Sequence, residues 1–208
     1  MIIMNRSIVK MHRNPSREPG KRRPAMPFTT AEITSVLERM QAEYDDAALI
    51  SSIHFGPTAM TFIRRLIAAG GIIVADTDLL ANDINPSLLG SNGARVACFI
   101  DEPYVVSLAE SRRVTRAEIA VDHALTLPGP KLMVIGSAPT ALQRLVMRRQ
   151  SEPMTDVCVL TALNGFASTV QLKERLWDSD LAKIVIRGKK GGPAVTATLL
   201  NTILSVLQ

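Results

Sequence analysis

The chain has 208 residues, of which 47% are hydrophobic, and this length and composition suffice for a buried core in a single domain. Its apolar runs, such as GGIIVA and KLMVIG, are far shorter than the roughly 20 residues that cross a bilayer, so we expect a soluble protein. Its two cysteines lie in apolar runs and are expected to be reduced thiols, which is consistent with a cytoplasmic location. The formal net charge of +5 would by itself suggest nucleic acid as a partner.

That charge is concentrated in the first 25 residues. They contain seven basic residues and one acidic residue, a net +6, which leaves −1 for the rest of the chain. The segment lacks the apolar region of a signal peptide, and its prolines interrupt regular structure. We predict a flexible basic arm over residues 1–25 and a single α/β domain over residues 26–208. A role of the arm in binding nucleic acid is the disfavoured alternative.

The first expected helix begins at Thr29, which has capping-box spacing to Glu32 and is followed by apolar residues on one helical face. A second helix is expected from Pro57 to the Gly70-Gly71 pair. Beyond it, short apolar runs alternate with helical patterns. Strands are expected over residues 72–75, 95–100, 131–135, 156–163 and 183–187, and helices over residues 103–112, 115–126, 139–150, 169–177 and 193–207.

Continuous apolar strands separated by helices are typical of a mostly parallel sheet that is covered on both faces. The sequence therefore predicts a Rossmann-like α/β fold with a five-stranded sheet. Cys98 and Cys158 lie in apolar runs and are expected to be buried and reduced. The sequence has no His and Cys spacing that is typical of a metal site, so we expect no metal.

In sheets of this kind the ligand lies beyond the carboxyl ends of the strands. Residue Asp76 and the segments 136–140 and 187–192 follow expected strands, and both segments lead into a helix that is expected to start with proline. Glycines let a ligand approach the backbone, and amides at a helix start attract anions. Neither segment matches a nucleotide-binding motif. They therefore predict a site for an anionic ligand that is not a nucleotide, unless they are ordinary tight turns.

Thr115 and Glu118 form a second capping-box pattern. Arg116 lies in the first turn of that helix, where the helix dipole disfavours a cation. We interpret Arg116 either as a ligand-binding residue or as a solvated surface arginine.

These segments together resemble the precorrin-8X methylmutase family of cobalamin biosynthesis. The residues that carry the resemblance are VADTDLL (74–80), CFIDEP (98–103), VTRAEIA (114–120), IGSAPTAL (135–142) and IRGKKGGPAVTATLLNTI (186–203). The resemblance implies an isomerase that shifts a methyl group from C-11 to C-12 of a corrin precursor, a tetrapyrrole with many carboxylates. It also implies a homodimer and no added cofactor. Whether the substrate contains cobalt is left open.

Family members use a histidine that follows an Arg-Met pair to exchange a proton with the ring. Without a gap between Arg39-Met40 and Phe55, Ala42 takes the position of that histidine. His54 would take its place only if the alignment contained a local insertion or deletion, and otherwise we expect a partly buried structural histidine. The family's Gly-Asn-Ala-Pro-Thr-Ala also differs here, because Ser137 replaces the asparagine.

Two functions therefore stand: a methylmutase of corrin precursors, or a related protein that binds a corrinoid or another polycarboxylate without catalysing the methyl shift. The catalytic position is expected at Ala42, with His54 as the alternative. The predicted substrate-binding residues are Arg39, Asp76, Thr115, Arg116, Gly136, Ser137, Ala138, Pro139, Thr140, Arg187, Gly191 and Gly192.

Overall fold

The sheet has six strands in the order β1-β6-β5-β4-β2-β3, in a computed structural model that describes residues 29–208. β1 runs antiparallel to β6, and all other neighbours are parallel. The strands are β1 (Ile53–Phe55), β2 (Ile72–Ala75), β3 (Arg95–Cys98), β4 (Lys131–Ile135), β5 (Val157–Thr161) and β6 (Ala182–Ile186). The predicted mostly parallel α/β fold is confirmed, while the predicted basic arm lies outside the described residues.

The expectation of five strands was wrong by one, because β1 was missed. β1 has only three residues, too few for a periodic apolar pattern. It forms by pairing with β6, where Ile53 faces Ile186 and Phe55 faces Ile184. This strand is thus defined by contacts with a segment far along the chain.

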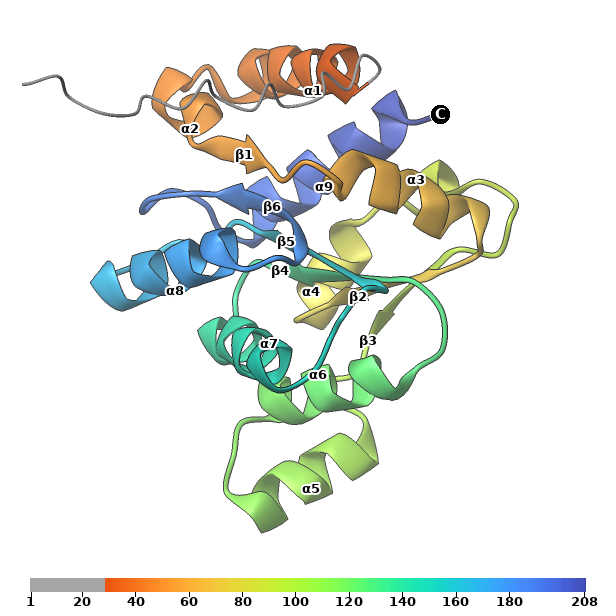
Figure 1. Ribbon diagram of the computed structural model, residues 1–208, viewed down its shortest axis with the longest axis vertical. Helices are drawn as coiled ribbons and strands as arrows, with labels where there is room; N and C mark the ends of the chain where they lie inside the picture. Colours follow the sequence, from red (N-terminus) through yellow and green to blue (C-terminus); the bar gives the residue numbers. More distant parts are fainter. Residues whose placement is uncertain (1–28) are drawn as a thin grey trace, which may run out of the picture.

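Helices cover both faces of the sheet, as the sequence predicted (Figure 1). Helices α1, α3, α4 and α9 lie on one face and α6, α7 and α8 on the other, while α5 packs outside α6. The helices are α1 (Thr29–Tyr44), α2 (Ala47–Ser51), α3 (Ala59–Ala68), α4 (Asp78–Asp83), the 3-10 helix η1 (Pro86–Leu89), α5 (Pro103–Arg112), α6 (Arg116–Thr126), α7 (Pro139–Ser151), α8 (Ala167–Asp178) and α9 (Pro193–Val206). No helix in this part of the chain is both long and apolar enough to cross a membrane.

The core consists of two apolar layers, one on each face of the sheet. Alternate residues of the central strands point to opposite faces, so a strand buried on both sides contains apolar residues throughout. On β2, for example, Ile73 packs toward the α1 and α9 layer and Val74 toward the α6 and α7 layer. This accounts for the continuous apolar runs that predicted the strands.

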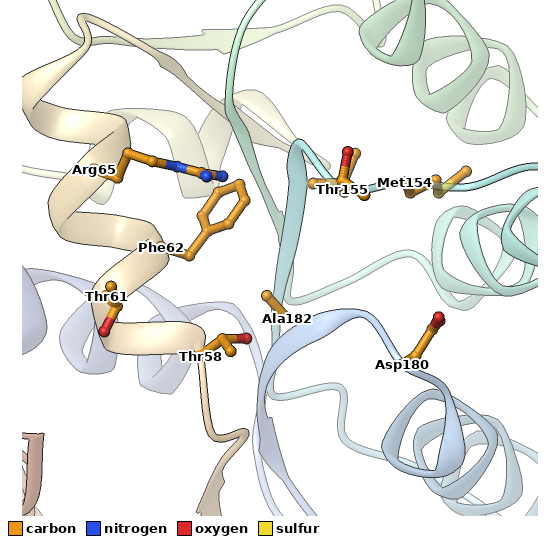
Figure 2. Close-up of a pocket in the computed structure, with 9 residues that line it drawn as sticks. Thr58, Thr61, Phe62, Arg65, Met154, Thr155, Asp180 and Ala182 are labelled. Atoms are coloured by element: carbon orange, nitrogen blue, oxygen red, sulfur yellow. The ribbon is translucent and has the colours of Figure 1, made fainter. Parts of the chain in front are cut away.

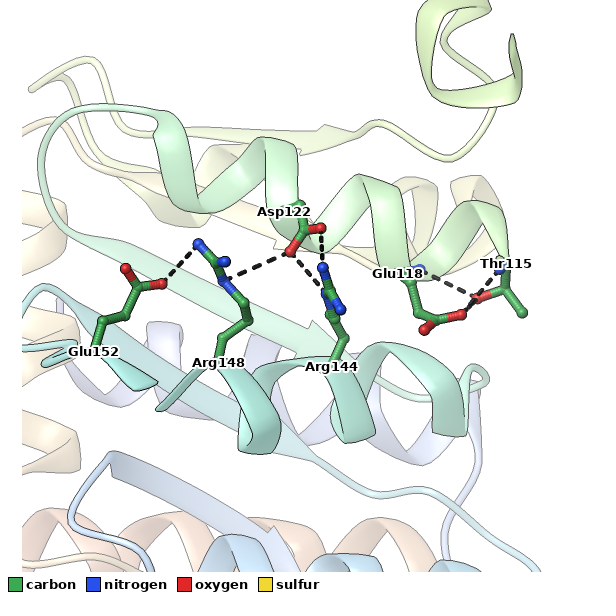
Figure 3. A network of polar contacts seen from close by, with 6 residues as sticks. All are labelled: Thr115, Glu118, Asp122, Arg144, Arg148 and Glu152. Carbon is green, nitrogen blue, oxygen red and sulfur yellow. Dashed lines mark hydrogen bonds and ion pairs between the residues drawn. The ribbon is translucent and has the colours of Figure 1, made fainter. Parts of the chain in front are cut away.

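Polar contacts of Asp122 join α6 to α7 (Figure 3). Asp122 accepts two hydrogen bonds from Arg144, at 2.9 and 2.6 Å. Arg148 pairs with Glu152 at 2.8 Å, and its Nε lies 3.7 Å from Asp122. These contacts hold the two helices side by side. Both helices begin at the carboxyl ends of the parallel strands, and this side of the sheet is called the carboxyl edge below.

Candidate functional site

The carboxylate of Asp76 organises the loop that follows β4. Its Oδ2 accepts hydrogen bonds from the backbone amides of Gly136, Ser137 and Ala138, at 3.1, 2.7 and 2.7 Å. Burial raises the pKa of the Asp76 carboxyl, and the three amides act in the opposite direction because they stabilise its charged form. The amides that the sequence suggested for a bound anion are therefore already hydrogen-bonded to Asp76.

The turn between β6 and α9 lies against the end of β5. Gly192 N donates to Ala162 O at 2.6 Å. A Cβ on Gly191 would lie 1.8 Å from the same oxygen, and its φ of 142° also excludes ordinary side chains. This approach requires glycine and places the 187–192 loop beside the loop that follows β5.

The loop after β4 also lies against the start of α9. A Cβ on Gly136 would approach Pro193 Cα to 2.9 Å. Pro139 and Pro193 are at the beginning of α7 and α9, as predicted. The capping box of Thr115 and Glu118 is also present. Thr115 is joined to the start of α7 by a 3.0 Å contact with the hydroxyl of Thr140.

These contacts gather most of the predicted binding residues at one edge of the sheet. The group contains Asp76, Thr115, Arg116, Gly136, Ser137, Ala138, Pro139, Thr140, Arg187, Gly191 and Gly192. Their role in binding substrate stays a prediction.

Arg39 stands apart from this group. Its guanidinium donates to Ser205 at 2.9 Å, near the end of α9, whereas Tyr44 contacts Thr198 at 3.0 Å. Helices α1 and α9 are therefore antiparallel. At a rise of about 1.5 Å per residue, Ser205 lies roughly 20 Å along α9 from Gly192. The structure thus brings the end of α1, but not Arg39, toward the carboxyl edge.

The predicted cations at this edge each pair with a carboxylate of the same chain. Arg116 lies 2.8 Å from Asp101, and Arg187 donates through Nε to Glu174 at 3.0 Å. The Arg187 guanidinium lowers the pKa of the Glu174 carboxyl. The sequence pattern contained no sign of these acidic partners.

A third such pair joins the 187–192 loop to the corner between α1 and α2. Lys190 Nζ lies 2.6 Å from Asp46 Oδ1, and this hydrogen bond lowers the pKa of the Asp46 carboxyl. Asp46 also caps α2 by accepting from Leu49 N at 3.0 Å. The pair therefore ties the end of α1, where Ala42 lies exposed, to the candidate site.

His54 lies on the opposite face of the sheet from α1. It pairs with Val185 across β1 and β6, and its ring packs 5.5 Å from that of Trp177 in α8. Burial first and the nearby Arg187 second lower the pKa of the His54 imidazole. These are contacts of a half-buried histidine in the layer of α8, while α1 and Ala42 belong to the other layer.

A hollow of about 360 Å³ opens at the opposite side of the sheet from the carboxyl edge, at the amino ends of β5 and β6 (Figure 2). Its titratable groups are Arg65, whose guanidinium lies 4.9 Å from the centre of the Phe62 ring, and Asp180, which pairs with Arg149. Within residues 29–208, no group of three or more His, Cys, Asp or Glu side chains is placed to hold a metal ion. The predicted binding residues gather instead at the carboxyl edge, which is the reason for placing the candidate site there.

Lys173 is a buried charge below this edge, and no local sequence pattern indicates its burial. Its side chain is fully buried, and its Nζ donates to Leu163 O at 2.6 Å. Burial lowers the pKa of the amine to about 8. Lys173 supports the end of β5, the strand against which the Gly191-Gly192 turn is packed.

The fold is that of a doubly wound α/β protein, a class in which ligands bind beyond the carboxyl ends of the parallel strands. A profile of the precorrin-8X methylmutase family matches residues 16–206. The chain therefore belongs to the precorrin-8X methylmutase family, which consists of isomerases of cobalamin biosynthesis.

Individual relatives agree with this assignment. The chain is 30% identical over 187 residues to the cobalt-precorrin-8 methylmutase of Salmonella typhimurium, covering 89% of this chain and 87% of that protein. It is 29% identical to the precorrin-8X methylmutase of Pseudomonas aeruginosa, with coverages of 74% and 75%.

Solved structures show the same fold. The precorrin-8X methylmutase of Thermus thermophilus is 28% identical, with a TM-score of 0.74 and 85% of each chain covered. A structure named as a precorrin-8X methylmutase related protein is 20% identical, with a TM-score of 0.77 and coverages of 86% and 94%. The latter supports the fold alone.

Proposed function

We propose that this chain binds precorrin-8 or cobalt-precorrin-8 at the carboxyl edge of its sheet and shifts a methyl group from C-11 to C-12 of the ring. The match of the family profile to residues 16–206 carries this proposal. The names of the Salmonella and Pseudomonas relatives differ in whether the substrate contains cobalt. Both forms are therefore candidate substrates.

Substrate carboxylates would bind by replacing carboxylates of the protein. The side chains of Arg116 and Asp101 are 50% and 64% exposed, and ion pairs this exposed contribute about 1 kcal/mol or less. A ring carboxylate can therefore exchange with Asp101 on Arg116 at little cost. Lys190, whose partner Asp46 is on the surface, offers a second position of the same kind.

A second candidate function is binding without the methyl shift, and Ala42 favours it. An imidazole that exchanges protons with a substrate contributes roughly 100- to 10,000-fold to the rate. Within residues 29–208, the two histidines are His54, which packs under α8, and His123, whose ring lies 4.7 Å from Phe99 in the layer of α6. Neither lies on the face of the sheet that α1 covers.

We further propose a homodimer in the cytoplasm. The resemblance to the family supports the dimer, and the free thiols of Cys98 and Cys158 support a reducing compartment. Burial raises the pKa of the Cys98 thiol to about 11, so this cysteine is a weak nucleophile at neutral pH. Sedimentation velocity of the full chain at several concentrations tests the dimer.

The visible spectrum of the ring separates the two candidate functions. The purified chain is incubated in turn with precorrin-8 and with cobalt-precorrin-8, and corrin formation is followed over time. A methylmutase converts one of the rings. A binding protein instead shifts the spectrum in proportion to the ring bound and forms no product. If neither ring is converted or bound, both proposals are wrong.

A further inference from the structure

Phe166 is the most exposed of the large apolar side chains in this part of the chain, at 87%. It follows β5 and directly precedes α8, so it lies at the carboxyl edge of the sheet. Its backbone is fixed, because its carbonyl accepts from the amides of Thr169 and Val170 at 3.1 Å each. The start of α8 therefore presents an exposed aromatic ring to solvent at the candidate site.

Lys189 lies on the loop next to Phe166. Gly165 N donates to Lys189 O at 3.3 Å, which joins the loops that follow β5 and β6. Lys189 is exposed and has no carboxylate partner within residues 29–208, whereas its neighbours Arg187 and Lys190 each have one. Its ammonium is therefore free to meet an anion without first losing a contact.

Exposed apolar residues that stand singly on a surface are common and need no function. Phe166 differs in its surroundings, because the loop that carries the unpaired Lys189 is hydrogen-bonded to Gly165, the residue before Phe166, and a Cβ on Gly188 in that loop would meet nothing within 4 Å. An exposed aromatic ring and an unpaired cation on adjoining loops suit a ligand with an apolar ring system and peripheral carboxylates.

From this juxtaposition we infer that Phe166 packs on the apolar face of the bound ring while Lys189 pairs with one of its peripheral carboxylates. The inference rests on the proposed corrinoid ligand and names two residues that position it. Phe166 contributes through loss of water from apolar surface, and Lys189 through charge. The two contributions therefore differ in their dependence on salt.

The test is a titration of the full-length protein with hydrogenobyrinate, a metal-free corrin with peripheral carboxylates, followed by its visible spectrum. Phe166→Ala should weaken binding about tenfold or more at every salt concentration. Phe166→Leu should restore most of the affinity. Lys189→Gln should weaken binding about two- to fivefold at low salt and make the affinity less dependent on salt.

Met147→Ala and Arg112→Gln are the matched controls. Met147 is an exposed apolar residue of α7, and Arg112 is an exposed arginine of α5 without an ion pair within residues 29–208. Both variants should bind as the wild type does. Urea denaturation should give equal stability for Phe166→Ala and the wild type, because an exposed ring adds little to the core.

Three results would overturn the inference. If the wild type binds hydrogenobyrinate and both Phe166→Ala and Lys189→Gln bind within twofold of it, the two residues do not contact the ring. If Phe166→Ala reduces self-association in sedimentation velocity but leaves the affinity unchanged, the ring of Phe166 packs against a second copy of the chain. If the wild type does not bind the corrin at all, the proposed function fails first and the inference fails with it.

Discussion

Asp76 Oδ2 lies 2.7 Å from the backbone nitrogen of Ser137 and joins the end of β2 to the start of α7. The same oxygen accepts from Gly136 and Ala138, while Oδ1 is buried without a hydrogen-bond partner within the described residues. The protein's own carboxylate thus occupies the amides that precede α7. Asp76 therefore shapes the candidate site through the loop rather than leaving those amides to a ligand.

Replacing Asp76 should test this structural role. We expect Asp76→Ala to lower the free energy of unfolding by about 2 kcal/mol or more, because partly buried amides lose their acceptor. Urea denaturation measures the change. Asp83→Ala is the control, since Asp83 is exposed at the end of α4 and should change stability by about 0.5 kcal/mol or less. Equal losses in the two variants would contradict the role of Asp76.

Lys173 should make stability depend on pH in the alkaline range. Burial lowers the pKa of its amine from 10.5 to about 8 in the folded protein. Between these values the unfolded chain holds a proton that the folded chain has released. The free energy of unfolding should therefore rise with pH in this window, by at most about 1.4 kcal/mol per pH unit.

The measurement compares urea denaturation of the wild type and Lys173→Met at several pH values from 7.5 to about 10.5. The difference between their pH profiles isolates this lysine from the other groups that titrate there. Lys189→Met, at an exposed position, should keep the wild-type profile. If Lys173→Met keeps it as well, the amine of Lys173 does not change its protonation on folding.

The ion pairs between α6 and α7 give a third prediction. Asp122→Ala leaves Arg144 and Arg148 side by side without the carboxylate between them (Figure 3). We expect a loss of about 1–2 kcal/mol in the free energy of unfolding at low salt, and a smaller loss at high salt because salt screens the remaining repulsion. Glu110→Ala, on the exposed surface of α5, should have little effect. A loss that is independent of salt would argue against charge as its cause.

The longer elements could be predicted because their patterns are local. The expected helix over residues 103–112 coincides with α5, and prolines correctly marked the starts of α7 and α9. β1 and α4 are too short for such patterns. Their conformation depends on neighbours, as in the pairing of His54 with Val185.

The positions of the turns at the candidate site could be predicted, but the carboxylates that pair with their cations could not. The turns after β4 and β6 were found from glycine and proline. Their partners were not, because the pair Lys190 and Asp46 joins residues 144 positions apart, and no local pattern indicates such a contact. A sequence with several cations at strand ends therefore suggested more free positive charge than the folded chain retains.

The last prediction concerns Ala42 and His54 together. Ala42→His should raise the rate of the methyl shift roughly 100- to 10,000-fold, because it adds an imidazole at the position that the ungapped alignment assigns to the proton-exchanging histidine of the family. His54→Ala should leave the rate unchanged, since His54 packs against Trp177 on the opposite face of the sheet. Single-turnover formation of the corrin, followed by its visible spectrum, measures both. Ala42→Gln is the control, because it adds a polar side chain of comparable reach that cannot exchange a proton near neutral pH. Full activity of the wild type that disappears in His54→Ala, with folding intact in urea denaturation, would instead make His54 the proton carrier and the ungapped alignment wrong.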